Sequence, residues 1–118
     1  MMIRAFQGSL RHALSGIVFV FRHERNIRFQ FFAGIAVLFA AAVLGVGRVQ
    51  FLILILVVCA MLVLECVNSA LEHFLDMVKP RLSDQVKIVK DISAGAVLIA
   101  ALGSVWIGWL IFSPVIRG

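Results

Sequence analysis

The sequence has 118 residues, of which 63% are hydrophobic and only 14% are charged. An average soluble domain is about half apolar and about a quarter charged, so this composition excludes an ordinary soluble protein and predicts a single-domain, all-α integral membrane protein. A chain this short cannot build a large core of its own, and association into an oligomer is therefore expected. The net charge of +5 comes from 11 Lys and Arg clustered beside apolar segments, which we interpret as topology signals and lipid-headgroup contacts rather than as a nucleic-acid surface.

Residues 1–25 are predicted to form an amphipathic helix that lies in the membrane interface. Apolar residues recur there at three- and four-residue spacing, with arginines among them. A charged junction, HERNIR, follows and contains Glu24 between Arg22 and Arg25. Taken alone, Glu24 favours a solvated helix junction over an acid held for phosphate or metal.

Three membrane-spanning helices are predicted to follow. The first is apolar except for Gln30, and its roughly eighteen apolar residues cover most of a ~30 Å hydrocarbon core. Gly45 begins the stretch GVGR, which predicts a helix stop rather than a phosphate loop, because no GK[ST] follows. Small residues at every fourth position of the third span favour close helix packing. The predicted spans are 29–47, 50–78 and 87–113.

Two prolines mark predicted helix ends. Pro80 is expected to end the second span, with Ser83 or Asp84 capping the helix that follows, and Pro114 is expected to close the third. Basic residues are concentrated before the first span and between the second and third. Under the positive-inside tendency, the N-terminal helix and the second loop are therefore cytoplasmic, on the side where ATP is available.

The stretch ECVNSALEHFLD places four polar side chains at steps of three, four and four, which is one face of a helix: Glu65, Asn68, Glu72 and Asp76. At ~1.5 Å per residue from Phe51, Glu65 lies near the inner edge of the hydrocarbon and Glu72 lies at the headgroup level. Acids this close to hydrocarbon usually face a bundle interior or a wet cavity. We therefore expect the functional site on this face.

The chemistry of these residues fits phosphoryl transfer. Carboxylates are ligands for Mg²⁺, which completes its shell with phosphates and water, while Asn68 and Lys90 could bind phosphate oxygens. Glu65 could accept a proton from a lipid hydroxyl. The spacing equally permits a non-catalytic protein whose acidic face is an ion path or an assembly element. The roles of Asp76, His12 and His73 stay open, although neither histidine has a second ligand at metal-binding spacing.

Three segments together carry a resemblance that covers nearly the whole chain. The pattern from Glu65 to His73 resembles the signature of the prokaryotic diacylglycerol kinase family, small three-span membrane enzymes that include undecaprenol kinases. KIVKDISAGAVL, from Lys87 to Leu98, resembles the family's second block. SLRHALSGI, before HERN, resembles its N-terminal surface helix.

The resemblance implies a homotrimer in the bacterial inner membrane, with active sites shared between protomers and facing the cytoplasm. It implies transfer of the γ-phosphate of MgATP to a lipid alcohol, with Glu65 as catalytic base and as a contact to the lipid substrate. The other residues that it assigns are Glu24 and Glu72 for metal and ATP, Asn68, Lys90 and Asp91 for ATP, and Ser69 for the lipid substrate.

The acceptor is expected to be diacylglycerol or undecaprenol. The junction HERNIRFQ is more similar to the undecaprenol kinase branch of the family than to the proteobacterial diacylglycerol kinase branch. Gln30 stands where the proteobacterial branch has a further acid. Undecaprenol is therefore the favoured expectation.

Overall fold

The structure is a computed structural model that describes residues 2–78 and 83–118. Every regular element in these ranges is a helix, which agrees with the predicted all-α class. The described helices are α1 (Met2–His23), α2 (Arg25–Leu44), α3 (Arg48–Val78) and α4 (Ser83–Arg117).

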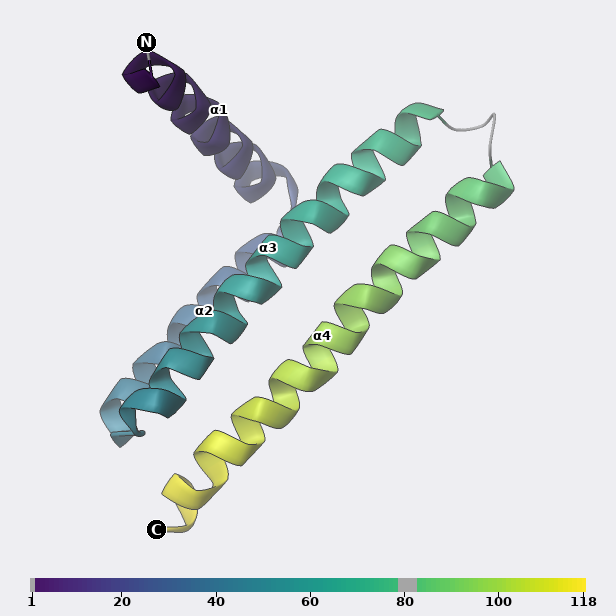
Figure 1. Cartoon of the computed structure of the whole chain (residues 1–118). Coiled ribbons are helices and arrows are strands. Elements are labelled where there is room, and N and C mark those ends of the chain that lie inside the picture. The colour runs from purple at the N-terminus through teal and green to yellow at the C-terminus, as the bar shows by residue number, and fades with distance from the viewer. Residues whose placement is uncertain (1, 79–82) are drawn as a thin grey trace.

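Helices α2, α3 and α4 are each long and apolar enough to cross a membrane. They run side by side, and α3 packs against both α2 and α4 (Figure 1). With 20 residues, α2 matches a hydrocarbon core of ~30 Å, whereas the 31 residues of α3 and the 35 residues of α4 exceed it by roughly 15–25 Å. The polar residues Glu72 and Asp76 lie near the C-terminal end of α3, and Lys87 and Lys90 lie in the first turns of α4.

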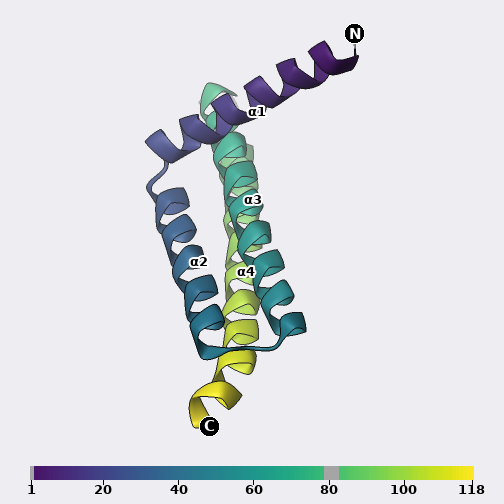
Figure 2. The same cartoon turned by 90° about the vertical axis from the view of Figure 1, so that its left-hand side faces the viewer.

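Helix α1 crosses one end of this bundle and contacts both α2 and α3 (Figure 2). The C-terminal part of α3 and the start of α4 lie at the same end of the bundle, opposite the C-terminus (Figure 2). The apolar side chains of α1, including Phe6 and Leu14, are exposed. Placement of α1 in the membrane interface stays a prediction.

The turn between α2 and α3 forms as the sequence predicts. Gly45 adopts φ 72°, a left-handed conformation that side chains with a Cβ rarely take. Its N–H reaches the carbonyl of Ala42 at 3.3 Å, and the N–H of Val46 reaches that of Ala41 at 3.2 Å. This is the Schellman arrangement, which satisfies the last carbonyls of a helix and stops it.

The helix end predicted at Pro114 is wrong. Pro114 lies inside α4, which continues to Arg117 and also begins at Ser83, before the predicted start of the span at 87. Proline lacks only one backbone donor, and the helix has just three residues left after it, so few hydrogen bonds are lost. The predicted helix stop at Pro80 lies outside the described residues.

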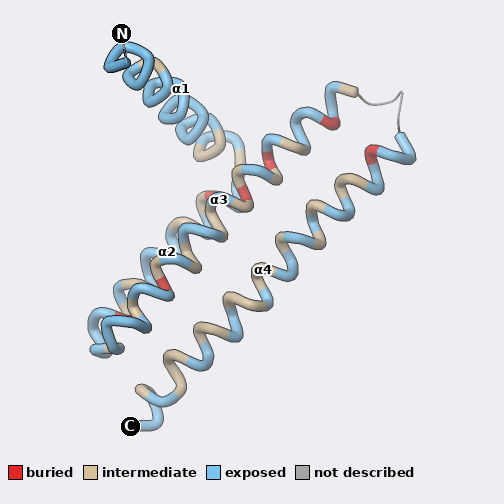
Figure 3. Tube along the Cα trace, in the orientation of Figure 1, coloured by how far each residue is buried: buried red, intermediate tan, exposed pale blue. Residues whose placement is uncertain are grey.

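Little of this chain is buried. Among residues 2–78 and 83–118, the buried positions are few and lie on the three long helices, for example Ile27, Leu54 and Val86 (Figure 3). Most large apolar side chains are exposed, for example Phe39 at 71% and Ile99 at 74%. Exposure of this kind is what a surface facing lipid or neighbouring protomers requires. Against that background, two buried polar residues on α3 stand out, Glu65 and Ser69.

Candidate active site

Glu65 is buried between α2 and α3, with 7% of its surface exposed. Its Oε1 accepts a hydrogen bond of 2.9 Å from Nε2 of Gln30 on α2. Gln30 and Glu65 are separated by 35 residues in the chain, and the contact exists because α2 and α3 pack side by side. The carbonyl Oε1 of Gln30 is buried and has no partner within the described residues. Leaving such an acceptor unsatisfied costs about 1–3 kcal/mol.

Glu24 lies in the link between α1 and α2, where its extended backbone (φ −112°, ψ 112°) breaks the helix. Its Oε1 accepts a hydrogen bond of 3.0 Å from the hydroxyl of Ser69 and lies 3.4 Å from Nε2 of His73. The ring of Phe19 on α1 meets His73 edge to face, with centroids 5.6 Å apart. In the sequence, Glu24 is part of a charged junction. In the structure, its side chain contacts α3 beside the acidic face.

Asn68 is held by the start of α4. The hydroxyl of Ser93 donates a hydrogen bond to Oδ1 of Asn68, so the amide NH₂ of Asn68 is the edge left for another acceptor. A phosphate oxygen is such an acceptor. The sequence assigns Asn68 to ATP and gives Ser93 no role.

Lys90, which is expected beside the nucleotide, and the nearby Lys87 are both paired with acids. Nζ of Lys90 lies 2.8 Å from Oδ1 of Asp76, which ties α4 to α3, and Lys87 pairs with Asp91 at 2.8 Å along α4 itself. Ion pairs with this much exposure contribute little to stability, because water screens the charges. Exchanging one of these carboxylates for a phosphate therefore costs little.

Glu72 is exposed, one turn beyond Ser69 on α3. Glu24 contacts Ser69, which lies between Glu65 and Glu72 on α3. The three acids therefore form one cluster on the end of the bundle where α1 crosses. Glu65 lies about 10 Å deeper along α3 than Glu72, at ~1.5 Å per residue.

The donor types in this cluster can be compared with those that a divalent metal takes. Mg²⁺ usually takes one or two carboxylates and fills its shell with phosphate oxygens and water. Glu24 and Glu72 supply two such carboxylates. In residues 2–78 and 83–118, no three His, Cys, Asp or Glu converge as a complete protein-made metal site. The donor set therefore suits a metal that arrives with phosphate better than one caged by the protein.

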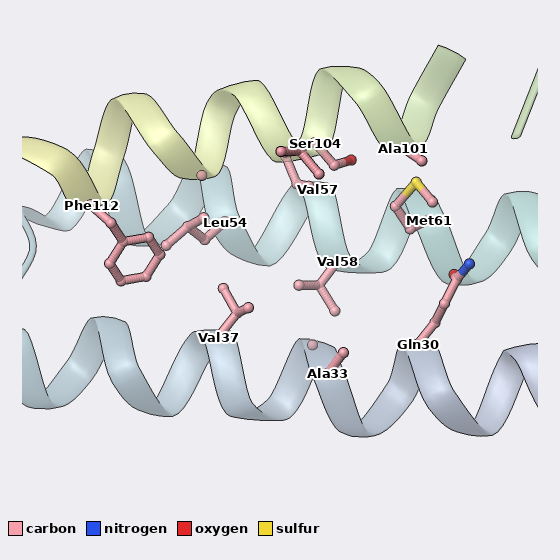
Figure 4. A pocket seen from close by; sticks show the side chains of 13 residues that line it. Gln30, Ala33, Val37, Leu54, Val57, Val58, Met61, Ala101, Ser104 and Phe112 are labelled. Carbon is pink, nitrogen blue, oxygen red and sulfur yellow. The ribbon is translucent and has the colours of Figure 1, made fainter. Parts of the chain in front are cut away.

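An apolar cavity of about 410 Å³ lies between α2, α3 and α4 (Figure 4). Gln30 is at one end of it and Phe112 at the other (Figure 4). Aliphatic side chains such as Val37 and Leu54 form most of its wall, and α4 contributes the small residues Ser104 and Gly108. Two members of the predicted small-residue packing stripe thus line a space within this chain.

The sequence predicted the acids of this cluster but not the side chains that contact them. Gln30 appears in the sequence as the one polar residue of an apolar span, and a polar residue at such a depth is a usable signal for a functional contact. Ser93 gives no comparable signal, because serine is common in membrane helices. His73 is adjacent to Glu72 in the sequence, yet only the fold shows that it reaches Glu24.

Comparison with known proteins identifies the family of this chain. The sequence profile described as prokaryotic diacylglycerol kinase matches residues 11–112. The chain is 37% identical over 107 residues to a diacylglycerol kinase of Synechocystis sp., and the alignment covers 90% of this chain and 61% of that protein. It is 36% identical over 112 residues to an undecaprenol kinase of Bacillus subtilis, and this alignment covers 95% of this chain and 91% of that protein. The chain belongs to the prokaryotic diacylglycerol kinase family, whose named relatives are lipid kinases.

Proposed function

We propose that this chain transfers the γ-phosphoryl group of MgATP to the hydroxyl of a membrane lipid alcohol at the cytoplasmic membrane interface. The observation that carries the proposal is the depth of the acids: Glu65 is buried at the deep end of the cluster, while Glu24 and Glu72 lie toward the headgroup end. A lipid hydroxyl can reach Glu65 from the membrane, and a water-soluble nucleotide can reach Glu24 and Glu72 from the cytoplasm.

In this proposal Glu65 is the catalytic base. Its carboxylate takes the hydroxyl proton as the hydroxyl oxygen bonds to the γ-phosphorus of ATP, and the bond from that phosphorus to the β–γ bridging oxygen breaks. ADP leaves with the electron pair of that bond, and the lipid phosphate remains in the membrane. General-base assistance of this kind contributes about 10²–10⁴-fold to a rate.

The nucleotide is proposed to bind at the headgroup end. Asn68 donates its free amide edge to a phosphate oxygen, and Lys90 exchanges Asp76 for another. Asp91 lies on the nucleotide side. Glu24 and Glu72 would hold Mg²⁺, which neutralises phosphate charge when it is bound.

The acceptor's hydrocarbon chain is proposed to enter the apolar cavity. The cavity begins at Gln30, which is hydrogen-bonded to Glu65, so a chain lying in it would present its polar end to the base. Its volume lies within the ~300–1,000 Å³ typical of small-ligand pockets. Undecaprenol and diacylglycerol are the two candidate acceptors, and undecaprenol is favoured by the HERNIRFQ junction.

The carboxylate of Glu65 can be tested in lipid vesicles with labelled ATP and both acceptors. Glu65→Gln is expected to lose transfer by about 10²-fold or more, because an amide cannot take the proton. Asp84→Asn makes the same chemical change on an exposed acid at the start of α4 and is expected to retain activity. Full transfer by Glu65→Gln would remove the proposed base, and no transfer by the unmodified protein to either acceptor would remove the proposed function.

The cavity has a matched pair of test positions on α4. Gly108 lines the cavity and Gly103 does not, and a Cβ on either meets nothing within 4 Å. Gly108→Leu is expected to raise the KM for the lipid acceptor by about 10-fold or more, since even one methylene gained or lost in a hydrophobic pocket is worth about 1–3 kcal/mol. The KM for ATP should stay unchanged. Equal effects of Gly103→Leu and Gly108→Leu on the acceptor KM would count against this binding site.

A homotrimer with shared active sites is proposed on the basis of family resemblance. The many exposed apolar side chains of the three long helices offer surface for such packing. Light scattering of the protein in detergent measures the oligomeric state directly. A monomeric, fully active protein would contradict the proposed sharing of sites.

A further inference from the structure

The side-chain amide of Gln30 contacts the acid that we assign as catalytic base. We propose that Gln30 is a positioning residue for Glu65: its Nε2 holds one carboxylate oxygen so that the other faces the acceptor hydroxyl. This inference rests on the proposed lipid kinase function, in which Glu65 takes the proton.

The two oxygens of Glu65 are in different situations. Oε1 accepts the hydrogen bond from Gln30 at 2.9 Å. Among the described residues, this is the hydrogen bond that the Glu65 side chain makes, and Oε2 is not among the fully buried atoms without a partner. Oε2 therefore keeps some access from outside and is the oxygen that can receive a proton.

An amide suits this task because it is a neutral donor. Glu65 lies on a helix with several rotatable bonds, and a fixed donor restricts the directions in which its carboxylate can point. A lysine or arginine in the same place would pair the base with a full positive charge and make it less ready to accept a proton. Gln30 orients the carboxylate without that charge.

The carbonyl oxygen of Gln30 shows that the side chain of Gln30 is held through Glu65. Its carbonyl Oε1 is buried at the polar end of the apolar cavity and has no partner in the described part of the chain. No second polar group there fixes the amide. Its orientation depends on Glu65, and the orientation of Glu65 depends on it in turn.

A purely structural contact is the competing explanation, since the bond also joins α2 to α3. The two roles differ in what they change. A structural clamp affects the folding of the bundle, the oligomer and the binding of both substrates. A positioning residue affects the chemical step and leaves the nucleotide site intact, because Asn68 and Lys90 are held by other partners.

Gln30→Met tests the proposal, because methionine keeps the length of the side chain and removes its hydrogen bonds. Gln50→Met is the matched control: Gln50 is an exposed glutamine in the first turn of α3, at the opposite end of the bundle. In vesicles that contain diacylglycerol or undecaprenol, we expect Gln30→Met to lower kcat by about 10- to 100-fold. The KM for ATP and the rise in melting temperature caused by MgATP should stay within about twofold of the unmodified protein.

The outcomes separate this inference from the proposed function. If Glu65→Gln is inactive and Gln30→Met keeps its full kcat, the base stands and the positioning role is refuted. If Gln30→Met loses kcat, nucleotide affinity and thermal stability together, the contact is a structural clamp and the inference is again refuted. If Glu65→Gln itself is active, the proposed base fails first. Should Gln30→Met not fold, Gln30→Asn provides the same test, since it keeps the amide but shortens its reach by one methylene.

Discussion

Helices α2 and α3 approach each other closely at Gly34, and this contact gives a quantitative prediction for bundle stability. A Cβ added at Gly34 would lie 2.6 Å from Cγ1 and 3.4 Å from Cγ2 of Val58. Distances below 3.0 Å are not found for real Cβ atoms, so the helices must separate or Val58 must change its rotamer. Valine on a helix has one strongly preferred rotamer, and relief by rotation is therefore restricted.

The size of the effect follows from two opposing terms. Overpacking of a tight core costs about 1–3 kcal/mol. Replacing glycine by alanine within a helix gains about 1 kcal/mol from helix propensity. Gly103→Ala on α4 isolates the clash, because a Cβ there meets nothing within 4 Å and the propensity gain is the same. Gly34→Ala should therefore be about 1–3 kcal/mol less stable than Gly103→Ala.

Reversible unfolding in mixed micelles, followed by circular dichroism, measures this difference. The variant Gly34→Ala, Val58→Ala removes both contacting methyl groups and should recover the loss, with a coupling free energy of about 0.5–3 kcal/mol. Gly34 is also one turn beyond Gln30, so separation of α2 from α3 should lower lipid kinase activity as well. Equal stability of Gly34→Ala and Gly103→Ala, or no coupling to Val58, would refute the reasoning.

Three further predictions concern the nucleotide site, the turn and the metal. Ser93→Ala frees the amide of Asn68 and should raise the KM for ATP by about 2- to 12-fold, the equivalent of about 0.5–1.5 kcal/mol, whereas Ser104→Ala, whose hydroxyl bonds its own helix, should not; equal KM values would contradict the role of Ser93. Gly45→Ala forces a Cβ into a left-handed conformation and should destabilise the bundle by about 1–2 kcal/mol in the same unfolding assay. Chelation of divalent cations should abolish phosphoryl transfer and added Mg²⁺ should restore it, and transfer that persists in excess chelator would argue against a metal at Glu24 and Glu72.

Predictions that depend on short stretches of sequence were confirmed where local chemistry decides the outcome. The helix stop at GVGR follows from one residue that adopts the left-handed conformation easily. The common helix face of Glu65, Asn68, Glu72 and Asp76 follows from helical periodicity alone, and α3 is continuous through all four. The predicted helix end at Pro114 was wrong, and the reason is also local. A proline near the end of a helix removes too few hydrogen bonds to terminate it.

The sequence by itself determined that this chain is an all-helical protein with three helices long and apolar enough to cross a membrane. It also placed three of the six acids, Glu65, Glu72 and Asp76, in the C-terminal part of the second of them. Hydropathy and helical periodicity are local properties, so they can be read without knowing how the helices pack. The tertiary structure decided which partner each acid received. Gln30 reaches Glu65 across 35 residues, Ser69 reaches Glu24 across 45, and Ser93 reaches Asn68 across 25. Contacts at such separations depend on which faces of neighbouring helices meet, and no periodicity within one helix specifies that.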